Sequence, residues 1–219
     1  MLKLFPLPLL KLFELLGVSI DSKLTFSSHI SSLCRKAKSR IRNLNRISYF
    51  LKRDQLRLLF NSYIISLFNY CPIIWMFCSK TSCREIDSIH KRALRAVYQD
   101  FSSSYEFLLQ TSGLKRIHEN HLCVLLCEVY KTLNSLNPKF MQSLFQVKIL
   151  RYSLRNCNLT LIPSARSSRY GTQSFLFRGS LLWNTLPDSA KSKPSLNSFK
   201  DALKLLNLLK FCTCKICGN

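Results

Sequence analysis

Residues 27–50 read SSHISSLCRKAKSRIRNLNRISYF, and the pattern of this stretch decides the fold class. Its apolar residues recur in steps of three and four, which places them on one face of an α-helix. That face contains Ile30, Leu33, Cys34, Ala37, Ile41, Leu44 and Ile47. Ser27 or Ser28 can cap the helix, which we expect to run to about Phe50.

The remaining surface of this helix is strongly cationic. It carries Arg35, Lys36, Lys38, Arg40, Arg42 and Arg46, with Arg53 just beyond. No acidic residue lies between Asp21 and Asp54, so the helix cannot neutralise its charge with ion pairs of its own. A charge run is usually a solvated face. The lack of interspersed acids favours contact with nucleic-acid phosphates instead.

Four further segments show apolar residues at helical spacing: residues 54–70, 82–98, 104–111 and 115–136. In the second of these segments, Ser82 and Glu85 fit a capping box. The same segment adds Lys91, Arg92 and Arg95 to the cationic surface.

The two ends of the chain differ from this helical middle. Residues 13–20 form a short apolar run that predicts a strand, with Asp21 and Ser22 as the turn after it. After about residue 146, short polar and apolar pieces predict short strands and loops. These pieces are separated by residues that favour turns: Pro163, Gly171, Gly179 and Pro187. Ser195 then caps a final helix, whose inward residues are Phe199, Leu203 and Leu206.

The expected fold class is therefore mostly α. It comprises a helical domain, a short irregular C-terminal region that contains β-structure, and a final helix. The two tryptophans, Trp75 and Trp183, are expected to anchor the core, because large aromatic side chains dominate core burial.

The whole chain carries 33 Lys and Arg against 11 Asp and Glu, a formal net charge of +22. Ion pairs can neutralise at most a third of these cations, so the others repel one another in the folded state. RNA or DNA relieves this repulsion, and such binding depends strongly on salt. No Gly-rich phosphate loop and no Ser/His/Asp arrangement appears, so no small-molecule substrate is expected.

The cysteines indicate a reducing, intracellular compartment. The chain has 10 cysteines, too dispersed for a disulfide framework. Cys34, Cys71, Cys123 and Cys127 lie in apolar helical patterns, where a thiol packs as a small hydrophobe. Residues 58–79 are the chief candidate for a membrane span. Their asparagines, serines and proline favour a buried helix, and a small membrane protein is the weaker alternative.

Two groups of residues have the composition of metal ligands. Cys212, Cys214 and Cys217 form C-x-C-x2-C, which offers three thiols where a closed zinc site needs four. Zinc is not expected there unless a distant residue or a second chain supplies the fourth ligand. A second group is His118, His121, Cys123 and Cys127. On one helix these four side chains cannot converge, so they are expected to be ordinary helix residues.

Several stretches occur in a distinctive order. They are LLGVSIDSKLTFSSHI at 15–30, YIISLFNYCPIIW at 63–75, IDSIHKRALRAVY at 86–98 and SLRN at 153–156. IPSARSSRYGTQSFLFRG follows at 162–179 and LWNTLPDSAKSKPSLNSFKDAL at 182–203. This ordered run resembles the C-terminal half of reverse transcriptases from jockey-like LINE (non-LTR) retrotransposons. The positions that match are Tyr70, Trp75, Arg92, Arg95, Arg166, Tyr170–Gly171, Arg178–Gly179, Trp183–Asn184, Leu186–Pro187 and Phe199–Lys200.

The resemblance implies a share in RNA-directed DNA polymerisation during retrotransposition. It assigns residues 1–24 to the end of the palm, 25–145 to the thumb, and 146–219 to the C-terminal region. A thumb of this family grips the template–primer duplex of RNA and DNA. The expected contacts here are Arg35, Lys36, Lys38, Arg40, Arg42, Arg46, Arg53, Arg92 and Arg95.

The family polymerase holds Mg²⁺ with paired aspartates, whereas no two acids are adjacent in this sequence. We therefore expect a fragment without catalytic residues or a cofactor of its own, inactive alone. Its expected partners are the missing palm and fingers, and its expected location is the nucleus or cytoplasm, as a ribonucleoprotein. The alternative is a non-catalytic, basic nucleic-acid-binding protein without polymerase ancestry; a ribosomal-type or organellar protein carries similar charge.

Overall fold

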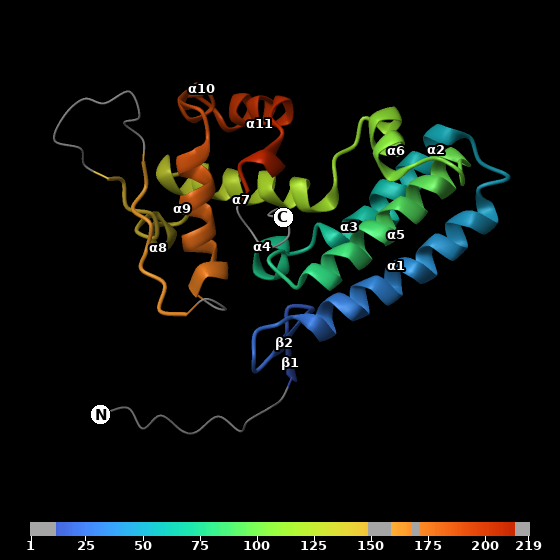
Figure 1. The fold of residues 1–219 in the computed structure, drawn as a ribbon, viewed down its shortest axis with the longest axis horizontal. Coiled ribbons are helices and arrows are strands. Elements are labelled where there is room, and N and C mark those ends of the chain that lie inside the picture. Colours follow the sequence, from blue (N-terminus) through green and yellow to red (C-terminus); the bar gives the residue numbers. More distant parts are fainter. Residues whose placement is uncertain (1–11, 149–158, 168–170, 213–219) are drawn as a thin grey trace. The chain divides into compact units, whose positions relative to one another are not determined.

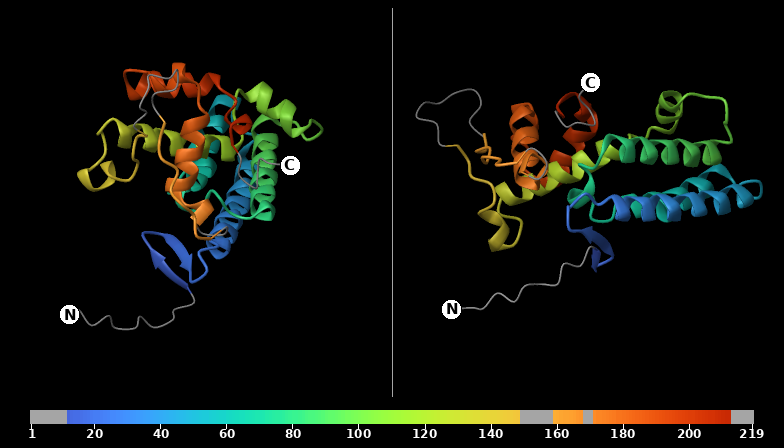
Figure 2. Two further views of the ribbon diagram at one scale, coloured as in Figure 1. Left: turned by 60° about the vertical axis from the view of Figure 1, so that its left-hand side comes forward. Right: turned by 60° about the horizontal axis from the view of Figure 1, so that its bottom comes forward.

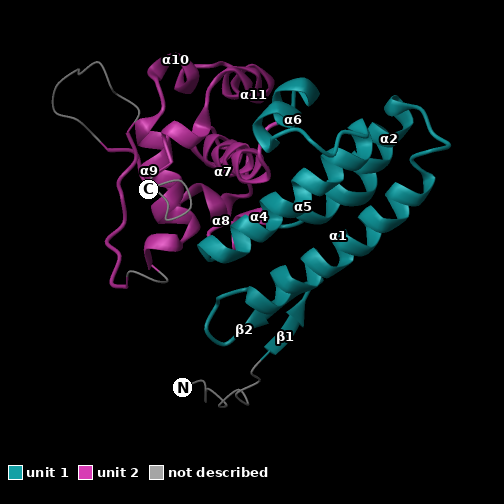
Figure 3. Ribbon diagram, turned by 45° about the vertical axis from the view of Figure 1, so that its right-hand side comes forward, with its two compact units in different colours: residues 1–71, 78–114 teal, residues 72–77, 115–219 magenta. Residues whose placement is uncertain are grey.

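The computed structural model describes residues 12–148, 159–167 and 171–212. This part of the chain is mostly helical, as the sequence predicts (Figure 1). It divides into two compact units, which Figure 3 colours separately. Unit 1 comprises residues 1–71 and 78–114, and unit 2 comprises residues 72–77 and 115–219. The palm, thumb and C-terminal ranges that the resemblance implies divide the chain at other places and stay a prediction.

Unit 1 begins with a β-hairpin in place of the single strand expected over residues 13–20. β1 (Leu12–Leu15) pairs antiparallel with β2 (Val18–Asp21). The chain reverses at Leu16 and Gly17, both with positive φ, and glycine adopts this conformation without steric cost. The turn predicted after the strand is confirmed, because Leu24 N donates to Asp21 O over 2.9 Å.

The rest of unit 1 is helical: α1 (Ser27–Ile47), α2 (Arg53–Leu59), the π-helix η1 (Phe60–Ile65), α3 (Ser66–Phe68), α5 (Lys80–Tyr98) and α6 (Tyr105–Ser112). Residues 30–44 of the predicted apolar face of α1 are buried, whereas Ile47 at its end is 41% exposed. α1 packs along α5, and Figure 2 shows the two helices side by side. This packing buries the apolar stripes of both helices.

Two predicted helix caps are wrong. Phe26 precedes α1 in a left-handed conformation and makes no capping hydrogen bond, so neither Ser27 nor Ser28 caps the helix. α5 begins at Lys80, and its cap is Ser79, whose hydroxyl accepts from Ser82 N over 3.2 Å. The helix therefore starts before the expected capping box, and Ser82 and Glu85 already lie inside α5.

Residues 58–79 do not form one helix. The segment runs through the end of α2, η1 and α3, and then through α4 (Pro72–Trp75), which belongs to unit 2. Within the described ranges, no helix combines the length and the apolar character that crossing a membrane requires.

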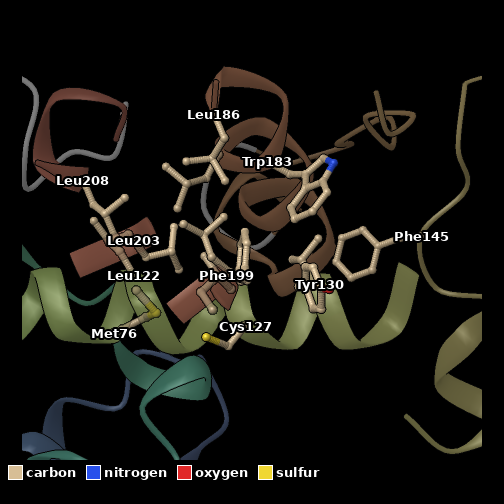
Figure 4. Close-up of a cluster of buried hydrophobic side chains, with 14 residues drawn as sticks. Met76, Leu122, Cys127, Tyr130, Phe145, Trp183, Leu186, Phe199, Leu203 and Leu208 are labelled. Atoms are coloured by element: carbon tan, nitrogen blue, oxygen red, sulfur yellow. The ribbon is translucent and has the colours of Figure 1, made fainter. Parts of the chain in front are cut away.

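Unit 2 is built on α7 (Ile117–Leu133). The elements that follow are α8 (Lys139–Gln142), the 3₁₀ turn η2 (Gly171–Gln173), α9 (Phe175–Thr185), α10 (Asp188–Lys191), α11 (Leu196–Leu205) and the 3₁₀ turn η3 (Leu208–Lys210). Figure 4 shows side chains from α7, α9 and α11 gathered in the core of this unit. Trp183 is 2% exposed there, and Trp75 is 1% exposed, which confirms both as core residues.

The C-terminal region is more helical than expected. In its described residues, the strand-like pairing is an isolated bridge between Val147 and Thr160. Residues 175–185, expected to be strand and loop, form α9. The final helix is confirmed: Ser195 caps α11, Phe199 and Leu203 are buried, and Leu206 packs against the core.

Candidate nucleic-acid interface

A groove runs between α1 and α5 in unit 1, with a volume of about 620 Å³. We call it the cationic groove. The residues that line it are Ser31, Arg35, Lys38, Ile41, Arg42, Asn45, Glu85, Arg92, Arg95 and Phe101. Five of these side chains are cationic, and one is a carboxylate. The groove therefore carries a concentrated positive charge, which attracts anions.

The position of the α1 cations follows from helix geometry. Arg35, Lys38 and Arg42 each come directly after a buried residue of the apolar stripe. One residue corresponds to about 100° around a helix of 3.6 residues per turn, so these side chains stand at the edge of the buried face. The packing of α1 on α5 brings this edge to the groove.

α5 supplies the opposite wall through Arg92 and Arg95, which flank the buried pair Ala93 and Leu94. Arg95 Nη2 donates to Ser103 O over 3.2 Å, which holds this guanidinium against the turn after α5. The predicted residues of two separate helices, Arg35, Lys38 and Arg42 with Arg92 and Arg95, are thus brought together.

The carboxylate in the groove is already engaged. Lys38 Nζ lies 2.6 Å from Glu85 Oε1, and the two side chains are 45% and 41% exposed. A pair this exposed contributes little to stability, because water screens it. Its main effect is to cancel one of the groove cations.

Four of the predicted contact residues lie elsewhere. Arg40 donates to the backbone carbonyl of Tyr63, and its guanidinium stands 4.4 Å from the centre of the Tyr63 ring. Arg53 stands 5.5 Å from the centre of the Tyr98 ring. Lys36 and Arg46 are exposed on α1 but do not line the groove. Arg40 and Arg53 are therefore held by aromatic neighbours inside unit 1.

The spacing of the groove cations suits a nucleic-acid backbone. Arg35 and Arg42 are separated by about 10 Å along the helix axis at 1.5 Å per residue. For an α-helix that lies along the axis of a duplex, that length corresponds to roughly three nucleotides of one strand, at about 3.4 Å of rise each. The row can therefore contact successive phosphates, which fixes a strand in place without reading its sequence.

The matching positions of the resemblance in unit 2 are mainly structural. Asn184 accepts from Thr160 N over 2.8 Å and donates to Thr160 O over 2.9 Å. Gly179 lies where an added Cβ would meet Phe145 and Val129 at 3.0 Å. Trp183, Leu186 and Phe199 are buried in the core. Tyr170 lies outside the described residues.

The candidate metal ligands give no assembled site in the described ranges. Cys214 and Cys217 lie outside them, and Cys212 packs against the core of unit 2. His118, His121 and Cys127 are buried on α7, and no cluster of three or more metal-binding side chains occurs among the residues with described positions. Burial raises the pKa of the Cys123 thiol to about 11 and that of Cys34 to about 12, so both stay protonated.

Sequence reasoning missed the groove residues that carry no positive charge, among them Ser31 and Asn45 of α1, Glu85 of α5 and Phe101 beyond α5. Helical spacing alone distinguishes the α1 cations that line the groove from some of the other cations on this helix. Arg35, Lys38 and Arg42 follow an i, i+3, i+7 pattern, whereas Lys36 and Arg40 fall on other faces. Nothing in the sequence indicates that Phe101, beyond the end of α5, lines the same groove as these α1 cations.

No protein-family model matches the chain, and no curated protein or solved structure shows significant similarity to it.

Proposed function

We propose that the cationic groove binds the phosphate backbone of a nucleic-acid duplex. The observation that carries this proposal is the meeting of five cationic side chains from α1 and α5 around one carboxylate. Such a surface is electrostatically unfavourable in isolation and is relieved by a polyanion. Phosphate contacts of this kind give affinity without sequence preference.

The resemblance to LINE reverse transcriptases supplies the biological setting of the proposal. In that setting the duplex is the RNA–DNA template–primer, and this chain contributes the thumb, which binds that duplex. The palm and fingers are the expected partners and supply the Mg²⁺-dependent chemistry. An intracellular ribonucleoprotein, in the nucleus or cytoplasm, is the corresponding location.

The duplex proposal is tested by comparing two triple variants of equal charge. Arg35→Gln/Arg42→Gln/Arg92→Gln removes three groove cations, and Lys36→Gln/Arg46→Gln/Arg57→Gln removes three exposed cations outside the groove. Binding of a fluorescent RNA–DNA duplex is followed by anisotropy at fixed salt. We expect the groove variant to lose at least about tenfold in affinity, and the control variant much less. Equal losses would show that net charge alone drives binding.

The ancestry is tested separately, by sequencing the coding DNA upstream of this reading frame. A paired-aspartate polymerase motif there, in frame or displaced by a frameshift, supports the thumb assignment. A stand-alone binding protein has no such motif, and the groove proposal then holds without the polymerase setting.

A further inference from the structure

Two turns meet at one end of unit 1. The side-chain amide of Gln99 donates to Ser48 O over 3.1 Å, which joins the turn after α5 to the turn after α1. Figures 1 and 2 show why these turns meet, because α1 and α5 run in the same direction and end together. Tyr49 and Phe50 follow α1, and Phe101 follows α5. We call these three residues the aromatic tip.

The aromatic tip is unusually exposed. The side chains of Tyr49, Phe50 and Phe101 are 88%, 80% and 66% exposed. The rings of Tyr49 and Phe50 touch edge to face, with centroids 5.6 Å apart. Single exposed apolar residues are common, but here two exposed rings touch and a third lies on a turn hydrogen-bonded to theirs, which favours a binding surface.

The turn that carries Phe101 is well ordered by its own hydrogen bonds. Asp100 Oδ1 accepts from Ser102 N over 3.1 Å and from Ser103 N over 3.0 Å. Hydrogen bonds from Ser103 and Ser102 lower the pKa of Asp100 to about 2, so this carboxylate stays charged at neutral pH. Phe101 is therefore presented on a fixed turn, which limits the entropy lost when a ligand stacks on it.

Phe101 also lines the cationic groove, as do Arg42 and Arg95. A strand whose phosphates follow the groove is thus led directly to an exposed aromatic ring. Stacked base pairs inside a duplex present no free ring face, whereas unpaired bases do. We propose that the aromatic tip stacks on unpaired bases of a strand that leaves the cationic groove, so that the chain prefers duplexes with a single-stranded extension. This inference rests on the proposed function of the groove.

Three fluorescent probes test the inference with the full 219-residue chain. They are a blunt RNA–DNA duplex, the same duplex with a short single-stranded extension, and the same extension built from abasic nucleotides. The abasic probe keeps the added phosphates but has no bases to stack. Extensions at the 3′ and 5′ ends are measured separately. We expect one of the two base-bearing extensions to bind about tenfold more tightly than both the blunt and abasic probes.

Variants then assign the preference to the tip. In Tyr49→Ala/Phe101→Ala, the probe with the base-bearing extension is expected to bind no more tightly than the blunt duplex binds to the same variant. Tyr49→Leu/Phe101→Leu keeps apolar side chains without aromatic faces and should lose the preference too. Phe107→Ala/Phe140→Ala removes exposed aromatics outside the tip and should keep it. Circular dichroism checks that each variant is folded.

The outcomes separate the two proposals. Equal wild-type affinity for blunt, extended and abasic probes overturns the stacking inference and leaves duplex binding by the groove intact. A preference that survives in both tip variants also overturns it. If sedimentation shows that tip variants change only the oligomeric state, the tip is a self-association surface and the inference is wrong. Failure of the groove triple variant to weaken blunt-duplex binding overturns the proposed function itself.

Discussion

The ammonium group of Lys38 lies 2.6 Å from the carboxylate of Glu85, across the groove between α1 and α5. Among the described residues that line the groove, Glu85 is the single acid. Glu85 therefore acts as an internal counter-ion of Lys38, and under the proposed function a phosphate that binds Lys38 would have to displace it. Removing the carboxylate should free a cation for the ligand.

Glu85→Gln is accordingly expected to tighten duplex binding, by about two- to fivefold, the range of an exposed charge pair. The change is measured by anisotropy at low and moderate salt, because screening should shrink the gain. Glu106→Gln makes the same change in net charge on α6, outside the groove. A gain of the same size in this control variant would mean that net charge, and not the groove, is responsible.

Acidification is expected to destabilise unit 1 through His90. This side chain is 2% exposed, its Nδ1 lies 2.7 Å from the Tyr105 hydroxyl, and burial lowers its pKa to about 4. An unfolded histidine has a pKa near 6.5, so between pH 6.5 and 4 the unfolded state binds more protons. Stability is therefore complete above pH 6.5 and falls as the pH drops towards 4.

Urea unfolding followed by circular dichroism at pH 7 and pH 5 measures this loss, which is expected on the order of 2 kcal/mol. His90→Gln should flatten the dependence on pH. A residual slope is expected from His29, whose pKa is also lowered by burial. An unchanged slope in the variant would contradict the assignment to His90.

The start of α1 depends on Asp21. Its carboxylate accepts from the backbone nitrogens of Lys23, Thr25 and Phe26 at 2.7 to 3.0 Å. Burial works to raise the pKa of Asp21, but these hydrogen bonds outweigh it and lower that pKa. Asp21→Ala should cost about 1 kcal/mol, comparable to the loss of a helix cap, because these hydrogen bonds hold the turn from which α1 starts.

The midpoint of urea unfolding measures this loss, with Asp54→Ala in the first turn of α2 as the control. Because the folded-state pKa of Asp21 is lowered, its contribution should be present at neutral pH and fade as the pH falls below about 4. A variant as stable as the wild-type chain at pH 7 would show that the carboxylate does not support α1.

Gly179→Ala should destabilise unit 2, although alanine favours helices. The new Cβ would lie 3.0 Å from both Phe145 Cζ and Val129 Cγ2, so the core must shift. Overpacking of this kind costs about 1 to 3 kcal/mol, more than the helix propensity that alanine gains. A thermal melt measures the change, and exposed Lys200→Ala on α11 is the control. A rise in melting temperature would contradict the packing argument.

Gly179 also shows where sequence reasoning fails. A glycine amid short apolar pieces reads as a loop signal, so α9 was not predicted. The structure uses that glycine for close contact between α9 and the side chains of Phe145 and Val129, which are distant in sequence. Local pattern cannot reveal a requirement set by tertiary contacts.

By contrast, α1 could be predicted because its signal is local. Seven apolar residues at helical steps fix the buried face, and those from Ile30 to Leu44 are buried as expected. The charge of the groove was also visible in sequence. The full set of residues that line the groove could not be predicted, because Glu85 and Phe101 join the α1 cations only when α5 packs against α1.

The salt dependence of duplex affinity tests the central claim most directly. Each phosphate contact made by a cation steepens the plot of log K against log salt by about 0.9. The groove variant Arg35→Gln/Arg42→Gln/Arg92→Gln is therefore predicted to reduce the slope by about 2 to 3, with little change in the Lys36→Gln/Arg46→Gln/Arg57→Gln control. Slopes that match the wild-type chain in both variants would contradict nucleic-acid binding at this groove.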